Sequence, residues 1–215
     1  MPVICPAILG DTKQTYDAQV RKIAAFAHRI QIDLTDGKFA PSKTVEPQDV
    51  WWPVGVKADI HLMYEQPLPA TKQLVAARPN LIIAHAEAGG SFSQFAAVCR
   101  EAGIKVGIAL LARTSAREVE AVLAQLDHVM IFSGHLGYEG GSSADLTLLQ
   151  KAKYLKGLKP DIEIGWDGGV NAQNVSQLVF GGVDVLNVGG FIQSAQDSAK
   201  AYETLVRIAD ETGET

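Results

Sequence analysis

The sequence has little cysteine and no long hydrophobic run. Its two cysteines, Cys5 and Cys99, are far apart and match neither a metal-ligand nor a redox spacing. We interpret them as reduced structural thiols, which is typical of a cytoplasmic protein. The longest apolar stretches, such as residues 108–112, hold only a few residues, so no transmembrane helix is expected. The N-terminus lacks a basic region followed by a long apolar segment, so we do not expect a secretory signal either.

An excess of positive charge is also missing. Lysine and arginine together number 19 against 24 aspartates and glutamates, which gives a formal net charge of −5. Proteins that bind nucleic acid normally carry a basic stripe, so we expect no nucleic-acid partner. With 47% hydrophobic and 20% charged residues, the composition is that of a globular chain rather than a disordered one. No stretch has the composition of a linker, so we predict a single domain over residues 1–215.

Short β-branched or apolar segments alternate with longer segments of helical period along the chain. The eight strand candidates are Val3–Leu9, Arg29–Leu34, Val56–Met63, Leu81–His85, Lys105–Leu110, His128–Phe132, Ile162–Asp167 and Val183–Val188. The helix candidates are Thr12–Ala27, Phe92–Ala102, Ala116–Leu126, Leu146–Leu158, Ala172–Phe180 and Ala195–Asp210. Eight strands in 215 residues leave about 27 residues per strand-and-helix unit, which predicts an α/β fold of the (β/α)8 TIM barrel type. A doubly wound sheet is the alternative, but the first strand lacks the glycine-rich dinucleotide turn.

Polar residues lie at the ends of several predicted strands, where a TIM barrel collects its chemistry. Asp33, His61 and Asp167 end the second, third and seventh strands. Each alone has an ordinary structural explanation, as a loop cap, a satisfied core histidine or a turn residue. Together they would meet inside an aliphatic barrel, where buried charges must be paired or bound to a cation. Two carboxylates and a histidine suit a divalent metal, and they also suit proton transfer next to a carbonyl.

Glycines follow the last three predicted strands. They are Gly137, Gly140 and Gly141 after the sixth strand, Gly168 and Gly169 after the seventh, and Gly189 and Gly190 after the eighth. A single Gly-Gly pair usually marks a tight turn. Glycines in three consecutive loops let backbone amides approach an anion, and the loops after strands seven and eight are the habitual phosphate site of this fold. The pattern therefore predicts a phosphorylated small molecule as ligand.

These motifs together resemble the ribulose-phosphate 3-epimerase family over nearly the whole chain. The segments that carry the resemblance are Pro6-Ala-Ile-Leu9, Ile32-Asp33-Leu-Thr-Asp36-Gly37-Lys-Phe39, Asp59-Ile-His61-Leu-Met63, His85-Ala-Glu87-Ala, Gly137-Tyr-Glu-Gly-Gly141, Asp167-Gly-Gly-Val170 and Gly189-Gly190. The resemblance implies a (β/α)8 barrel that inverts carbon 3 of a ketopentose phosphate through an enediolate. It implies that Asp33 and Asp167 are the paired acid and base, and that His61 joins both aspartates in binding a divalent metal ion.

The resemblance also implies roles for other residues. The phosphate would be held by Gly140, Gly141, Gly168, Gly169, Gly189 and Gly190, and Met63 is retained among the methionines that line the family's site. Gln31 stands where the family has a fourth metal ligand, a histidine. A glutamine carbonyl is a poorer ligand than imidazole for zinc-like ions, so we expect weaker binding or a shift toward an oxygen-preferring ion. The candidate metals are Zn, Mn, Fe, Co and Mg.

Other substitutions fall in the same region. Ala7, Thr35 and Phe132 replace a serine and two methionines of the family pattern, and Gly190 replaces a serine. His135 and Leu136 stand where the family usually has an Asn-Pro or Glu-Pro pair, and Glu139 is one extra residue in that loop. These changes concern the choice of sugar more than the fold.

The leading hypothesis is a metal-assisted epimerase acting on ribulose 5-phosphate or a related ketose phosphate. A phosphosugar lyase or decarboxylase on the same barrel is an alternative, although His61 stands where the decarboxylases usually have a lysine. A non-catalytic descendant that binds a phosphate ligand is another: Gln31 and Ala7 favour it, and the two surviving aspartates count against it.

Four further residues are not expected to contact the substrate or the metal. His85 and Glu87 are interpreted either as a hydrogen bond behind the metal site or as surface residues. Trp51 and Trp52 are interpreted as packing residues or as a contact between subunits of a homo-oligomer, a dimer or a hexamer.

Overall fold

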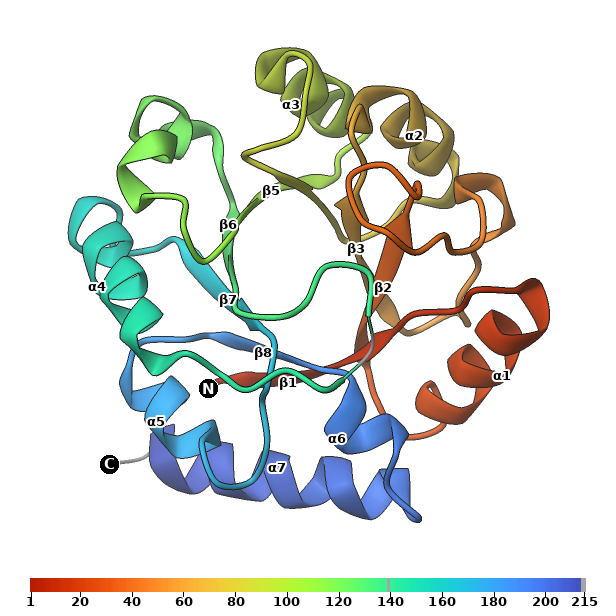
Figure 1. Cartoon of the computed structure of the whole chain (residues 1–215), viewed down its shortest axis with the longest axis vertical. Helices are drawn as coiled ribbons and strands as arrows, with labels where there is room; N and C mark the ends of the chain where they lie inside the picture. The colour runs from red at the N-terminus through yellow and green to blue at the C-terminus, as the bar shows by residue number, and fades with distance from the viewer. Residues whose placement is uncertain (139, 214–215) are drawn as a thin grey trace.

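A computed structural model describes residues 1–138 and 140–213, and Glu139 of the loop after the sixth strand lies outside the described residues. Eight parallel strands form a closed barrel in the order in which they occur in the chain (Figure 1). They are β1 (Val3–Ile8), β2 (Arg29–Thr35), β3 (Lys57–Met63), β4 (Leu81–His85), β5 (Lys105–Leu110), β6 (His128–Phe132), β7 (Glu163–Asp167) and β8 (Val185–Val188). The predicted (β/α)8 barrel is confirmed, and each predicted strand is present within two residues of its expected ends.

Helices surround the barrel on the outside (Figure 1). The α-helices are α1 (Lys13–Ile23), α2 (Pro67–Leu74), α3 (Phe92–Glu101), α4 (Leu149–Leu158), α5 (Val175–Phe180), α6 (Gly190–Gln193) and α7 (Ser198–Gly213). Single or extended 3-10 turns are η1 (Pro47–Asp49), η2 (Val75–Ala77), η3 (Ala116–Gln125) and η4 (Leu146–Leu148). None of these described helices is long and apolar enough to cross a membrane.

The helix predictions were less accurate than the strand predictions. Residues 116–125 form 3-10 turns rather than the expected α-helix, and the expected helix from Ala172 begins only at Val175. Helix α2 was not predicted because its first turn contains Pro67 and Pro69, although proline is tolerated in the first turn, where backbone N–H groups lack helical partners. Helix α1 ends at Ile23 instead of Ala27, since the chain turns there and Phe26 packs against Tyr202 of α7.

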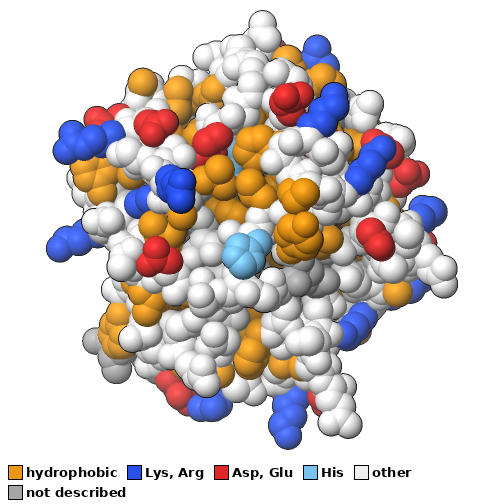
Figure 2. Space-filling model, viewed as in Figure 1, with side chains coloured by type: hydrophobic (Ala, Val, Ile, Leu, Met, Phe, Trp, Pro, Cys, Tyr) orange, Lys and Arg blue, Asp and Glu red, His pale blue; other side chains and the backbone are white. Residues whose placement is uncertain are grey.

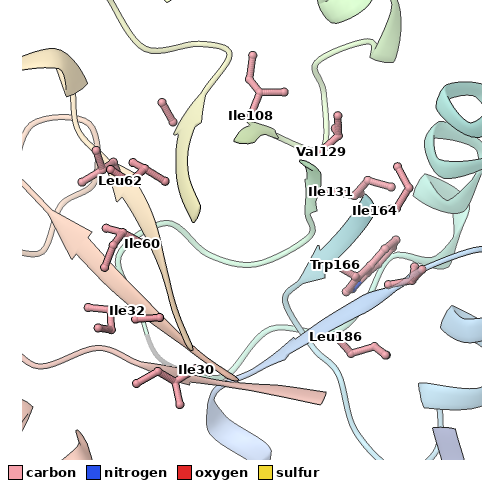
Figure 3. Close-up of a cluster of buried hydrophobic side chains, with 14 of the residues drawn as sticks. Ile30, Ile32, Ile60, Leu62, Ile108, Val129, Ile131, Ile164, Trp166 and Leu186 are labelled. Carbon is pink, nitrogen blue, oxygen red and sulfur yellow. The ribbon is translucent and has the colours of Figure 1, made fainter. Parts of the chain in front are cut away.

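Two packing layers follow from the alternation of side chains along each strand. The outer layer lies between strands and helices, and its strand residues include Ile30, Ile32, Ile60, Leu62, Ile131, Ile164, Trp166 and Leu186 (Figure 3). The inner layer within the barrel is smaller and contains Leu81, Ile83, Ala109, Met130 and Phe132. Because Ile30, Ile32 and Leu34 of β2 belong to the outer layer, the intervening residues of β2 face the barrel interior.

Charged side chains close the N-terminal end of the barrel. Arg29 contacts Asp59 at 2.7 Å and Glu163 at 2.8 Å, and His128 Nδ1 lies 2.8 Å from Glu163 Oε2. Asn80 donates a further hydrogen bond of 2.6 Å to Asp59. Since buried charges are tolerated only when they are paired, this network gives both Asp59 and Glu163 their partners. The candidate functional site lies at the opposite, C-terminal end of the barrel.

Trp51 is held within the chain in the β2–β3 connection. Its indole N–H donates a hydrogen bond of 2.6 Å to Asp17, and the guanidinium carbon of Arg21 lies 5.1 Å from its ring centroid. Both Trp51 and Trp52 are partly buried and pack against the outer core layer. These contacts support the packing interpretation, and a subunit contact at this place remains a prediction.

Candidate functional site

Strand register brings the predicted polar residues to one end of the barrel interior. In the β2–β3 pair, Asp33 lies opposite His61 and Thr35 lies opposite Met63. Asp167 ends β7, which is separated from β2 by β8 and β1, and it reaches the same place. Ligand atoms of Asp33, His61 and Asp167 all lie within 4.8 Å of one another. The two aspartates therefore lie close together at this end of the barrel.

A glutamine amide lies between the two carboxylates. Gln31 Nε2 donates to Asp33 Oδ1 at 2.9 Å and to Asp167 Oδ2 at 2.5 Å. His61 Nδ1 lies 3.0 Å from Asp33 Oδ1 and 3.8 Å from Asp167 Oδ2. Gln31 and His61 are completely buried, and Asp33 is 8% exposed. The four side chains form one cluster, and both carboxylates retain some access to solvent.

Burial and the neighbouring charge act on Asp167 together. Burial is the larger cause and repulsion by the Asp33 carboxylate is the second, and both raise the pKa of Asp167 well above its usual range. His61 and the hydrogen bond from Gln31 act in the opposite direction. A carboxylate under these conditions holds a proton more readily than an exposed one, which is the property of an acid that donates a proton near neutral pH.

His85 lies directly behind His61. The two Nε2 atoms are 2.8 Å apart, and His85 Nδ1 lies 3.4 Å from Glu87 Oε2. His85 is only 3% exposed, and burial lowers its pKa to about 4. Of the two interpretations given for His85, the structure supports a position behind the candidate metal site, where its Nε2 contacts His61, and not a surface position.

A cavity of about 410 Å³ opens above the two aspartates at the C-terminal end of the strands. Its walls include most of the glycines predicted to bind phosphate, together with Met63: Gly140, Gly141, Gly168, Gly169, Gly189 and Gly190. Gly137 is not among the lining residues, and a Cβ atom there would fall 2.3 Å from the hydroxyl of Ser42. The segment after β6 crosses the mouth of the barrel toward β2, which explains this contact (Figure 1).

Several of these glycines are also required by loop packing. A Cβ atom on Gly168 would lie 2.2 Å from the backbone nitrogen of Gly134, and its φ of +113° disfavours other residues. A Cβ atom on Gly190 would lie 2.7 Å from the Cα atom of Gly140. The loops after β6, β7 and β8 therefore touch through their backbones. Their glycines have a structural reason as well as the predicted phosphate role.

The cavity also contains polar residues that the sequence analysis did not assign to the site. They are His135, Tyr138, Ser142, Asn171, Asn187 and Ser194. Figure 2 shows a histidine near the centre of this face, with hydrophobic side chains beside it. Most of these residues lie within a few positions of the predicted glycines. Their place near the C-terminal ends of β6, β7 and β8, close to the predicted glycines, was the signal that could have identified them.

Two buried polar atoms near the aspartates have no hydrogen-bond partner among the described residues, Gln31 Oε1 and His85 Nδ1. A half-turn of the Gln31 amide would direct its oxygen to a cation held by Asp33, His61 and Asp167, and the cation would then replace the two N–H donations to the aspartates. A proton on His85 Nδ1 would face Glu87. The donor set, oxygens with one imidazole nitrogen, fits a divalent metal. The residues present therefore fit such an ion.

Comparisons with known proteins find relatives that are similar over nearly the whole chain. The ribulose-phosphate 3-epimerase from Bacillus subtilis is 28% identical over 211 residues, which cover 94% of this chain and 97% of the relative. The enzyme of the same name from Synechocystis is 30% identical over 211 residues, covering 93% of this chain and 90% of the relative. The crystal structure of 3-hexulose-6-phosphate synthase from Salmonella typhimurium has a TM-score of 0.74 at 14% identity, covering 98% of this chain and 99% of that one, and it supports the fold alone.

The sequence profile of the ribulose-phosphate 3 epimerase family matches residues 3–193, from the first residue of β1 to the last residue of α6. The match spans every strand and all four residues of the aspartate cluster. This chain belongs to the ribulose-phosphate 3-epimerase family.

Proposed function

We propose that this protein is an epimerase that inverts carbon 3 of a ketose phosphate, with ribulose 5-phosphate as the first candidate. The observation that carries the proposal is the pair Asp33 and Asp167, which come from β2 and β7, with β1 and β8 between these strands, and which line the same cavity close to each other. Curated relatives named ribulose-phosphate 3-epimerase, similar over nearly the full length, support it.

Inversion next to a carbonyl needs an acid and a base on opposite faces of one carbon. One aspartate removes the proton, and the electron pair moves into the carbonyl to form an enediolate. The other aspartate then gives a proton to the opposite face, so that the configuration is inverted. Because Asp33 comes from β2 and Asp167 from β7, a carbon between them would have one carboxyl group on each side.

A divalent ion held by Asp33, His61 and Asp167, with Gln31 Oε1 as a further ligand, would stabilise negative charge on the enediolate oxygens. The fourth ligand is an amide oxygen rather than an imidazole. This favours Mg²⁺ or Mn²⁺ over Zn²⁺, since carbonyl and carboxylate ligands suit the harder cations. Fe²⁺ and Co²⁺ remain within the proposed range.

The glycine-walled part of the cavity is the proposed place of the phosphate group. Gly168, Gly169, Gly189 and Gly190 lie in the loops that follow β7 and β8, the usual phosphate position in this fold. The hydroxyl groups of Ser142 and Ser194 line the same cavity and can donate hydrogen bonds to phosphate oxygens. Met63 and Phe132 line the part of the cavity near the aspartates.

Solvent exchange at carbon 3 tests the proposal. The wild-type chain with added Mg²⁺ or Mn²⁺ is incubated in D₂O with a panel of ketose phosphates, and incorporation of deuterium is followed by NMR. We expect exchange on at least one member of the panel. We expect Asp33→Asn and Asp167→Asn each to lower the rate by about 10²-fold or more, because an amide can neither accept nor deliver this proton.

Two results would contradict the epimerase. A folded, metal-supplemented protein that exchanges no deuterium on any ketose phosphate, yet binds them, would indicate a phosphate-binding protein without catalysis. Cleavage of a carbon–carbon bond or release of CO₂ would indicate a lyase on the same barrel. Glu203→Gln, an exposed change on α7, is the matched control and should leave the rate unchanged.

A further inference from the structure

We propose that His85 and Glu87 are positioning residues that hold His61 in the tautomer able to bind a metal. The proposal rests on the metal site of the proposed function. Neither residue touches the cavity above the aspartates, so both act through His61.

The side chains form one chain of contacts leading away from the aspartates. Asp33 Oδ1 lies 3.0 Å from His61 Nδ1, the Nε2 atoms of His61 and His85 lie 2.8 Å apart, and His85 Nδ1 lies 3.4 Å from Glu87 Oε2. Both imidazole rings are buried, whereas the Glu87 side chain is 22% exposed. A partly exposed carboxylate thus faces a buried pair of histidines from behind.

Hydrogen-bond donors and acceptors allow two arrangements of this chain. A neutral imidazole has one N–H donor and one acceptor nitrogen, and an ionised carboxylate only accepts. If His61 Nδ1 carries the proton, it donates to Asp33, and His61 Nε2 must accept from His85 Nε2. The remaining His85 nitrogen then faces Glu87 as one acceptor against another. In this arrangement His85 Nδ1 has no donor to pair with, and at 3.4 Å from Glu87 Oε2 it makes no hydrogen bond.

The opposite arrangement satisfies Glu87. His85 Nδ1 then donates to Glu87, His85 Nε2 accepts from His61 Nε2, and His61 Nδ1 presents a lone pair toward Asp33 and Asp167. Three acceptors converge there, and a cation is the partner that satisfies all of them. The negative charge of Glu87 favours this second arrangement, so it favours the form of His61 that ligates a metal.

The surrounding residues hold both groups in place. The ring of His85 packs against two phenylalanines, with centroid distances of 4.8 Å to Phe39 and 5.6 Å to Phe132. Glu87 accepts a hydrogen bond of 3.0 Å from the backbone N–H of Leu111. Rotation of either side chain would break these contacts. His85 and Glu87 therefore help to set the orientation of His61, together with the aspartates.

Metal affinity measured by calorimetry tests the proposal. Mn²⁺, Mg²⁺ and Zn²⁺ are titrated separately into the metal-stripped wild type, Glu87→Gln, Glu87→Ala and the control Glu203→Gln. We expect Glu87→Ala to weaken binding by about 10–100-fold, because it removes the acceptor of His85. Glu87→Gln should weaken it less, since its amide oxygen can still accept that proton. Glu203→Gln should bind like the wild type.

A second measurement determines the tautomers of His61 and His85 and does not depend on catalytic activity. Nitrogen-15 NMR of histidine-labelled protein with bound Zn²⁺ should show His61 and His85 protonated at Nε2 and Nδ1 respectively, and Glu87→Ala should lose this pattern for His85. Thermal melting and circular dichroism verify that each variant is folded. Wild-type binding that Glu87→Ala leaves unchanged would overturn the positioning role alone. A wild type that binds none of the three ions would overturn the metal site and this role with it.

Discussion

At the scale of single residues, the candidate site departs from the family pattern at Gln31, which stands where the family has a histidine. Its amide is uncharged, completely buried and hydrogen-bonded to both aspartates, which lie in segments 134 residues apart in the sequence. An N–H group between two carboxylates reduces their mutual repulsion without a net positive charge. A histidine at this position would offer a nitrogen ligand to a metal, whereas glutamine offers only its carbonyl oxygen.

Gln31→His should therefore change which metal the chain prefers. We expect the affinity for Zn²⁺ to rise by about tenfold or more, because imidazole replaces a carbonyl oxygen in the ligand set. The affinity for Mg²⁺ should fall or stay the same, since this ion prefers oxygen ligands. Calorimetric titration of both ions into metal-stripped protein measures the ratio. An unchanged ratio of the two affinities would mean that residue 31 does not ligate the metal.

At the scale of elements, the loops after β6, β7 and β8 depend on backbone contacts that only glycine allows. Gly168 and Gly169 both have positive φ, and a side chain on either would overlap the backbone of the loop after β6. These contacts shape the wall of the cavity in which we propose that the phosphate binds. Loop stability and ligand affinity should consequently change together at these positions.

Gly168→Ala should destabilise the protein by about 1–3 kcal/mol from backbone strain, with an additional cost from the overlap with Gly134. Affinity for inorganic phosphate should fall as well, because the two loops must separate. Gly157→Ala is the matched control: this glycine lies within α4 with nothing near its Cβ position, and the change should stabilise by about 0.5–1 kcal/mol. Urea unfolding compares the two, and equal stabilities would contradict the steric argument.

At the scale of the whole molecule, the two ends of the barrel have different roles. The N-terminal end is closed by paired charges, and the C-terminal end carries the aspartates and the cavity. Glu163 belongs to the closed end. Burial alone would raise its pKa, but hydrogen bonds from Arg29 and His128 and the charges of both lower the pKa well below its ordinary value of 4.5.

This lowered pKa makes stability depend on pH. A carboxylate whose pKa is lower in the folded state stabilises the fold fully above its unfolded pKa, and this stabilisation is lost as the pH falls toward the folded pKa. Glu163→Gln should therefore lower the free energy of unfolding at pH 7, with a difference that shrinks progressively below about pH 4.5. Urea unfolding at pH 7, 5, 4 and 3 measures it, beside the exposed control Glu203→Gln. A difference that is constant over this range would refute the linkage.

The strands and the site residues Asp33, His61 and Asp167 could be predicted because the patterns that indicate them lie within short stretches of sequence. Short β-branched or apolar segments mark the strands, and the two-residue period along β2 and β3 let Asp33 and His61 be placed in the barrel interior before any coordinates. The α2 helix was missed because its prolines obscure the pattern. Residues 116–125 have a helical period and a capping Ser115, and nothing local distinguishes their 3-10 turns from an α-helix.

By itself, the sequence determined the order of strands, the inward position of the aspartates and the family, because side-chain periodicity and motif spacing do not depend on distant contacts. Only the tertiary structure decided that the Gln31 amide lies between Asp33 and Asp167, and that His61 contacts His85. Closure of the barrel sets these distances. The distances depend on the register of β2 against β3 and on the position of β7. Both are set by the closed ring of eight strands.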